Sequence, residues 1–267
     1  MSRRTWTPAA PAGAEPVDAA TEHPGPARTG TEQQRRSPGT AARRSRDARP
    51  GAEQTRARTR AVVLQAASVC LQYPDEEVLG TLPVVRRAVE ALPDGVPRAR
   101  LTTFGGWAEA TSAAEGPGAL ARHYVDVFDT RRRCCLYLTW WTDGETRRRG
   151  GALAALKARY RAAGVEFGSR ELPDFLPAVL EYAATADLAD GLALLQEHRA
   201  GVELLRLALL DAGTPYAAPV EAVCALLPGP SPADVAAAKA LARSGPPREQ
   251  VGLELAPFGT RPEGAPR

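Results

Sequence analysis

The side chains best able to do chemistry are concentrated between Tyr124 and Gly150. This stretch contains five aromatic residues, two arginine triplets, two adjacent cysteines and several carboxylates. Three kinds of site draw on such residues: a phosphate-binding surface, a thiol-based catalytic or metal centre, and a binding surface for another polypeptide. Each kind places its own demands on spacing and charge, so the three can be compared on the sequence alone.

A nucleic-acid site would use the arginines of 131–133 and 147–149 on phosphates and the aromatic rings as stacking platforms. Four acidic residues in the same stretch would pair with these arginines or repel phosphate: Asp126, Asp129, Asp143 and Glu145. Up to Arg60 the chain has twelve arginines, no lysine and six acidic residues, a net charge of +6. Because the whole chain carries +3, the remainder carries −3, which disfavours a general polyanion-binding surface. A helical nucleic-acid-binding regulator that uses the Arg-rich segments is the alternative function.

A thiol or metal centre would recruit Cys134 and Cys135. Adjacent side chains on a helix point about 100° apart, so the two thiols do not readily join one tetrahedral site. The chain has no CxxC pair, which favours reduced thiols, and the histidines show no ligand spacing. An enzyme with Cys134 or Cys135 as its nucleophile is a second rival.

Catalytic motifs do not strengthen the enzyme hypothesis. The sequence has no GxSxG, Walker A, GxGxxG or HExxH pattern. Asp174 and Glu181 are seven residues apart and would share a helix face, but carboxylates so placed are usually solvated or paired with arginine. We therefore predict that the protein is not an enzyme and that it uses no metal and no cofactor.

The elements that must position these residues are predicted to be helices, because apolar residues recur at intervals of three and four from Ala61 onward. Asp75 and Asp187 are placed to cap helices, and Pro83 is expected to divide or kink the second helix. No strand–helix alternation or Asn-Gly hairpin occurs, which predicts an all-α fold, an irregular helical bundle. The predicted helices are 61–73, 75–92, 97–111, a stripe over 120–128, 145–163, 173–185, 187–213, 217–227 and 231–243.

Composition divides the chain into three parts. Residues 1–58 are rich in Arg, Pro and Gly and have almost no large aliphatic residues, so we expect a disordered extension. The all-helical domain is predicted over 59–243, and a flexible Pro/Gly-rich tail over 244–267. No stretch has the roughly 18 uncharged apolar residues of a membrane span. The Ser-Arg-Arg-Thr start lacks a following apolar region, which argues against export and favours the cytoplasm.

Three segments of the chain resemble one known family. They are CLQYPD over 70–75, HYVDVFDTRRRCCLYLTWWTDGETRRRG over 123–150, and ELPDFLPAVLEYA over 171–183. The resemblance is to the NarJ family, the nitrate reductase molybdenum cofactor assembly chaperones, also called the delta subunit. It covers about residues 60 to 227, and the second segment is the most specific.

The resemblance implies an all-helical cytosolic chaperone that is absent from the finished enzyme. Its partner would be the apo form of the catalytic alpha subunit, recognised chiefly through its N-terminal segment while in complex with the beta subunit. The chaperone would hold this client ready for insertion of the molybdenum cofactor and restrain early docking on the membrane subunit. Related chaperones often carry a histidine after the aspartate of the third segment; Phe175 stands there in this chain.

The residues and the resemblance together predict a docking surface for the client polypeptide. Aromatic side chains supply contact area with few rotatable bonds, and charges at the rim set the register. Trp140 and Trp141 are adjacent, so both cannot point inward from one helix. The predicted docking residues are Tyr124, Asp126, Phe128, Arg133, Tyr137, Trp140, Trp141, Asp143, Asp174 and Glu181.

Overall fold

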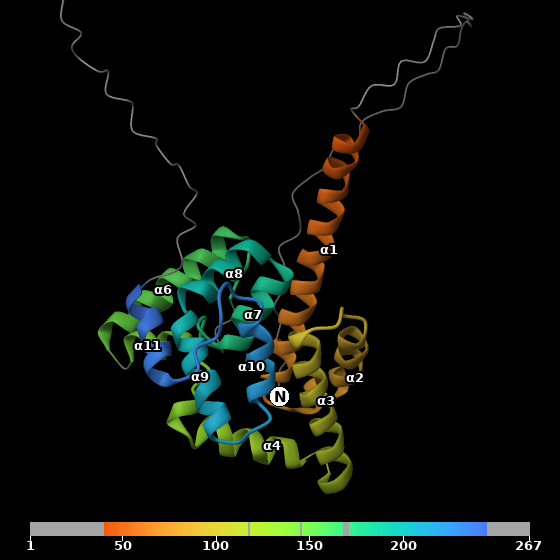
Figure 1. Cartoon of the computed structure of the whole chain (residues 1–267). Helices are drawn as coiled ribbons and strands as arrows, with labels where there is room; N and C mark the ends of the chain where they lie inside the picture. The colour runs from red at the N-terminus through yellow and green to blue at the C-terminus, as the bar shows by residue number, and fades with distance from the viewer. Residues whose placement is uncertain (1–39, 117, 145, 168–170, 245–267) are drawn as a thin grey trace, which may run out of the picture.

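A computed structural model describes residues 40–244, apart from 117, 145 and 168–170, with side chains described from residue 51 to residue 241. Helices make up most of this part of the chain and no strand occurs in it, which confirms the predicted all-α bundle (Figure 1). The predicted tail segments 1–39 and 245–267, and Glu145, lie outside the described residues. The helices are α1 Thr40–Cys70, α2 Glu76–Glu90, α3 Val96–Glu115, α4 Gly118–Tyr124, a π-helical turn η1 Val125–Asp129, a 3-10 turn η2 Arg132–Cys134, α5 Leu138–Asp143, α6 Arg147–Ala162, α7 Leu176–Thr185, α8 Leu188–Glu197, α9 Arg199–Asp211, α10 Ala217–Cys224 and α11 Val235–Ser244.

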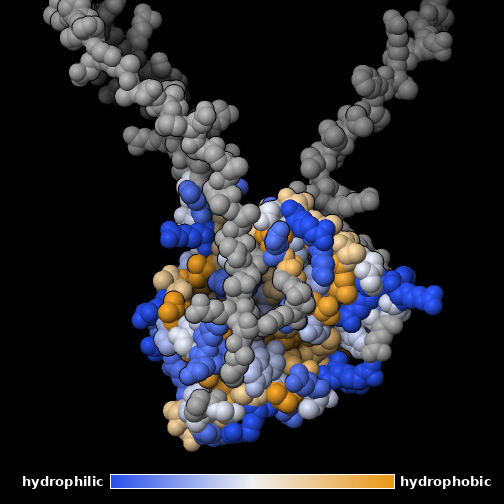
Figure 2. All heavy atoms as spheres, turned by 180° about the vertical axis from the view of Figure 1, so that it is seen from behind, coloured by the Kyte–Doolittle hydropathy of each residue, from blue (hydrophilic) through white to orange (hydrophobic). Residues whose placement is uncertain are grey.

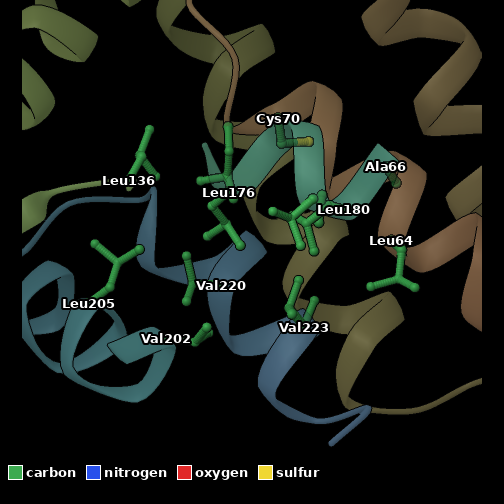
Figure 3. Close-up of a cluster of buried hydrophobic side chains, with 14 of the residues drawn as sticks. Leu64, Ala66, Cys70, Leu136, Leu176, Leu180, Val202, Leu205, Val220 and Val223 are labelled. Carbon is green, nitrogen blue, oxygen red and sulfur yellow. The ribbon is translucent and has the colours of Figure 1, made fainter. Parts of the chain in front are cut away.

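Two short helices, α7 and α10, form the interior of the bundle. Every residue of α10 except Glu221 is buried, and six of the ten residues of α7 are buried. A helix that is apolar on all sides belongs in a core, because no face of it gains from contact with water. Side chains of α1, α7, α9 and α10 converge there, as the labelled residues of Figure 3 show.

The first helix is longer than predicted. It begins at Thr40, so residues 40–58, which we predicted to be disordered, are helical up to the packed section of α1. Figure 1 shows this half rising clear of the other helices, and residues 51–60 are mostly exposed. Starting a helix is costly, whereas extending one is cheap for Ala, Arg, Glu and Gln. The buried residues from Val63 onward therefore stabilise a helix that continues into an otherwise polar segment.

Two predicted helix caps agree with the structure, whereas the prediction for the interior of α2 does not. Asp75 accepts a hydrogen bond from the Val78 amide at 2.9 Å, and Asp187 accepts one from the Asp190 amide at 2.9 Å, which confirms both caps. Of the division or kink expected at Pro83, the division does not occur, since α2 runs through it. Proline has no backbone NH, so one carbonyl of the preceding turn lacks its helical hydrogen bond. Pro83 is exposed, so water can donate to that carbonyl instead.

The predicted helix over 187–213 is also two helices, α8 and α9, which meet at His198. Close approaches to neighbouring helices constrain both. A Cβ at Gly191 would lie 2.2 Å from the Cβ of Ala183 on α7, and a Cβ at Gly201 would lie 2.8 Å from the Cβ of Trp141 on α5. The absence of a side chain at these two glycines therefore allows α8 to pack closely against α7 and α9 against α5.

A buried group of charges joins α9 to the loop before α11. Glu203 is fully buried, with Arg206 at 2.6 Å and Arg199 at 3.7 Å. Arg199 also donates to the carbonyls of Gly229 and Pro230, both at 2.9 Å. Buried charges require such partners, so this group holds the loop against α9. No helix among the described residues combines the length and apolar character needed to cross a bilayer.

Candidate functional site

The segment singled out in the sequence folds as a chain of short, irregular turns. After α4 the backbone widens into η1, where the Thr130 amide donates to the Val125 carbonyl at 3.2 Å. Asp126 and Arg131 form an exposed ion pair at 2.7 Å across this turn. π-Helical turns are uncommon and occur often at functional sites. The segment then passes through η2 into α5, the six-residue helix that carries both tryptophans.

This irregular segment is held in place by the start of α7. Tyr137 and Phe175 form an antiparallel bridge, in which the Leu138 amide donates to Asp174 O at 2.9 Å and the Leu176 amide donates to Leu136 O at 2.8 Å. Their rings are 5.4 Å apart. Two segments nearly forty residues apart in the chain thereby share one short stretch of sheet-like pairing.

Asp174 strengthens the same junction from inside the protein. Its side chain is completely buried. One carboxylate oxygen accepts hydrogen bonds from the Thr139 amide at 3.1 Å and from the Thr139 hydroxyl, and lies 3.5 Å from the Arg149 guanidinium. The carboxylate therefore accepts a hydrogen bond from an amide in the first turn of α5. The backbone amides of a first helical turn have no acceptor within their own helix. Asp174 is placed as an internal anchor and not as a surface contact.

Between η1, η2, α5 and Phe175 lies a hollow of about 240 Å³, which we call the aromatic hollow. The Trp140 ring lines it, and the Arg132 guanidinium lies over that ring, 5.4 Å from its centroid. The Tyr137 hydroxyl donates to Glu171 at 3.1 Å, and burial is the main cause that raises the pKa of this phenol. The full lining is Tyr124, Phe128, Asp129, Arg131, Arg132, Cys135, Leu136, Tyr137, Trp140 and Phe175.

The structure brings together only part of the predicted docking set. Tyr124, Phe128, Tyr137 and Trp140 line the hollow, and Asp126 lies beside it through its pair with Arg131. The remaining five do not line it: Arg133, Trp141, Asp143, Asp174 and Glu181.

The two tryptophans separate as the sequence requires. Trp140 lines the hollow, whereas Trp141 is half-buried against the core, and its indole NH donates to the Cys135 carbonyl at 3.1 Å. Tyr124 is also mainly a core residue, 6% exposed.

Six residues that line the hollow were not among the predicted docking residues: Asp129, Arg131, Arg132, Cys135, Leu136 and Phe175. Five of them lie in the same conspicuous run as the predicted residues, so the density of unusual side chains was the available signal. Phe175 lies far along the chain, and only the departure from histidine distinguished it.

The thiol-nucleophile hypothesis finds little support in this geometry. Cys134 is buried and Cys135 half-buried, and burial raises the pKa of both thiols, which keeps them protonated and weakly nucleophilic near neutral pH. Among the arginines of the two triplets, Arg131 pairs with Asp126, Arg132 covers Trp140, and Arg149 points to buried Asp174, whereas Arg133, Arg147 and Arg148 are exposed. The nucleic-acid alternative stays a prediction from the sequence.

The fold and the hollow define a class: an all-helical protein whose distinctive site is an aromatic and cationic recess. The family model described as "Nitrate reductase delta subunit" matches residues 90–222. The probable nitrate reductase molybdenum cofactor assembly chaperone NarJ of Bacillus subtilis (strain 168) is 34% identical over 146 residues, which is 55% of this chain and 77% of that protein. This chain belongs to the nitrate reductase delta subunit family, as the resemblance predicted.

Two further relatives differ in how much of their length is shared. The nitrate reductase-like protein NarX of Mycobacterium tuberculosis (strain ATCC 25618 / H37Rv) is 42% identical over 163 residues, which is 61% of this chain. The chain spans only 24% of that protein. The NarJ chaperone of Escherichia coli (strain K12) is 46% identical over 61 residues, 23% of this chain and 26% of that protein.

Proposed function

We propose that this protein is an assembly chaperone for a respiratory nitrate reductase and does no chemistry of its own. It binds the apo catalytic alpha subunit, in complex with the beta subunit, and holds it open while the molybdenum cofactor is inserted, before membrane docking. Membership of the delta subunit family and similarity to NarJ assembly chaperones support this role. Action in the cytoplasm stays a prediction from the sequence.

The observation that carries the proposal is the aromatic hollow. Four of the aromatic residues predicted for docking meet there, between cationic side chains, on a segment pinned by α7. Aromatic and arginine side chains in a recess are the residue types that contribute most to binding another polypeptide. An N-terminal client segment with an apolar side chain next to an acidic group would suit the Trp140 ring and the guanidinium groups of Arg131 and Arg132.

Release follows from differential affinity. A chaperone that binds the immature subunit more tightly than the mature one shifts the client toward its open state by that difference alone. Cofactor insertion then removes the preferred partner, and the complex dissociates without any energy source. The same reasoning explains why such a protein needs no catalytic residues.

The test is calorimetric titration of the full chain with a peptide from the N-terminus of the alpha subunit. Replacing Trp140 by Ala or Arg132 by Ala should each weaken binding about tenfold or more, the effect typical of a central interface residue. Trp140→Phe should restore most of the affinity, because it keeps an aromatic ring in the hollow. Arg87→Ala is the matched control for charge, because Arg87 is exposed on α2 and does not line the hollow. Unchanged affinity in both Trp140→Ala and Arg132→Ala would remove the hollow as the docking site.

A further inference from the structure

The N-terminal part of α1 stands apart from the bundle and has no part in the client site. Figure 1 shows it leaving the other helices, and the core begins to bury α1 only from Val63 onward. We call residues 40–60 the basic arm. At about 1.5 Å per residue of helix, this arm is about 30 Å long. The family model, which matches residues 90–222, does not include it.

The basic arm carries most of the positive charge of the N-terminal part of the chain. Residues 40–60 contain seven arginines and two acidic residues, Asp47 and Glu53, so the arm has a net charge of +5. The side chains of Arg56, Arg58 and Arg60 are exposed, and none of the three forms an ion pair with a described residue. Their guanidinium groups are therefore available to an anionic partner.

The negative charge of the rest of the chain does not cancel the charge of the basic arm. The chain after Arg60 carries a net charge of −3. In physiological salt the Debye length is about 8 Å, so charges several times farther apart hardly interact through water. Because the arm extends about 30 Å from the bundle, its outer charges act on an anionic surface independently of the acidic bundle.

The composition of the basic arm excludes insertion into the hydrocarbon of a bilayer. Helices that enter the bilayer interface have an apolar face. Residues 40–60 contain no Val, Leu, Ile, Met, Phe, Tyr or Trp. The bundle differs, since Figure 2 shows hydrophobic residues interspersed among hydrophilic ones on the face opposite to that of Figure 1. Binding by the arm would therefore be electrostatic and would stay at the level of charged headgroups.

The arginines match phosphate, which occurs in both nucleic acids and phospholipids, because a guanidinium group donates two hydrogen bonds to it. Nucleic-acid sites also contain side chains that stack on bases, and a helix that lies in a groove is continuous. The arm has no aromatic residue, and Pro50 and Gly51 weaken the helix at its middle. A bend at this point allows the outer part of the arm to lie along a flat surface. These features favour a phospholipid surface.

We propose that the basic arm binds the headgroup phosphates of an anionic phospholipid membrane. Arg56, Arg58 and Arg60 supply guanidinium groups to these headgroups, and no side chain of the arm enters the hydrocarbon. This inference rests on the proposed function, because a chaperone whose client docks on a membrane subunit benefits from being held at that membrane. It assigns a role to a segment that the client site does not use.

Vesicle flotation of the full chain tests the proposal. Neutral phosphatidylcholine vesicles are compared with vesicles in which about 30% of the lipid is anionic phosphatidylglycerol. The protein should float with the anionic vesicles only. Raising the salt concentration from about 0.1 M to 1 M shortens the Debye length from about 10 Å to 3 Å and should release the protein.

A triple variant locates the binding on the arm. Arg56→Gln, Arg58→Gln and Arg60→Gln together remove three charges, and glutamine has nearly the helix propensity of arginine, so the arm should stay helical. Each basic residue near an anionic surface strengthens binding roughly fivefold, so the triple variant should bind about a hundredfold more weakly. Replacing the same three residues by lysine keeps the charge and should keep most of the affinity.

The matched control removes the same charge elsewhere. Arg147, Arg148 and Lys157 are exposed on α6, and their joint replacement by glutamine should leave vesicle binding nearly unchanged. Equal losses in the two triple variants would show that overall charge is responsible and would overturn the proposal. Equal binding to neutral and anionic vesicles, or binding that persists in about 1 M salt, would also overturn it.

Nucleic acid is the remaining occupant to compare. The proposal fails if the parent chain binds a DNA duplex of about 20 base pairs through the same three arginines but does not bind anionic vesicles. The client site is tested separately, because vesicle binding needs no client. Weak vesicle binding of the parent chain with normal affinity for the alpha-subunit peptide would refute the role of the arm alone. Unchanged peptide affinity in Trp140→Ala and Arg132→Ala, with normal vesicle binding, would refute the aromatic hollow alone.

Discussion

Replacing Asp174 tests whether the aromatic hollow depends on an internal anchor. Its carboxylate is completely buried and receives two hydrogen bonds from Thr139 and one long contact from Arg149. In Asp174→Ala these donors lose their acceptor. The Thr139 amide in the first turn of α5 is then left without a hydrogen bond. The bridge between Tyr137 and Phe175 is formed by backbone groups and would then stand without side-chain support.

The magnitude follows from the partners. Hydrogen bonds to a charged group contribute about 1.5–3 kcal/mol each, and removing one member of a buried pair costs about 3–5 kcal/mol. Arg149 is 22% exposed and can turn to water, which favours the lower figure. We therefore expect Asp174→Ala to reduce the free energy of unfolding by about 3 kcal/mol. Asp174→Asn keeps an acceptor oxygen and should cost about 1–2 kcal/mol.

Urea unfolding followed by tryptophan fluorescence measures this change, since Trp140 and Trp141 lie on the affected helix. Asp143→Ala is the matched control: it removes a carboxylate from the same helix whose hydrogen bond comes from an exposed neighbour, Thr142. The control should change the free energy of unfolding by less than about 0.5 kcal/mol. Equal effects of the Asp174 and Asp143 substitutions would refute the anchoring role.

Two further predictions concern stability. Gly191→Ala should lower the free energy of unfolding by about 1–3 kcal/mol, because its Cβ would lie 2.2 Å from that of Ala183. Gly151→Ala has open space around it and should raise the free energy of unfolding by about 0.5–1 kcal/mol. A stabilised Gly191→Ala protein in urea titrations would contradict the close packing of α7 and α8. Burial is the main cause that lowers the pKa of His198, so this group stabilises the fold above its unfolded pKa of about 6.5 and the stability is lost as pH falls through the folded pKa. Unfolding measured from neutral pH down through that range should therefore show a falling free energy whose slope is smaller in His198→Gln, and an identical slope would show that His198 is not the group responsible.

The sequence was a good guide to the two capped helix starts and a poorer one to the start of α1 and to helix breaks. Asp75 and Asp187 could be identified because a cap bonds to an amide three residues away, and both ends of that contact are local. The extension of α1 to Thr40 and the break at His198 were not predicted. Residues 51–60 are mostly exposed and have no apolar periodicity, and the apolar periodicity of 187–213 continues across the break.

The candidate site shows the same division. Tyr124, Phe128, Tyr137 and Trp140 were predicted from the density of aromatic residues, and the structure places all four around one hollow. Asp174 was predicted on the same surface, yet it is fully buried. The sequence does not distinguish an aspartate that contacts a partner protein from one that accepts a hydrogen bond from a buried amide.

By itself, the sequence determined the helical class, the two caps, the family and the run of residues from which the hollow is built, because these depend on residue type and spacing along the chain. The tertiary structure alone decided which members of that run meet, that Phe175 joins them, and that Asp174 anchors them from within. Those outcomes depend on contacts between segments far apart in the chain, whose partners no local pattern specifies.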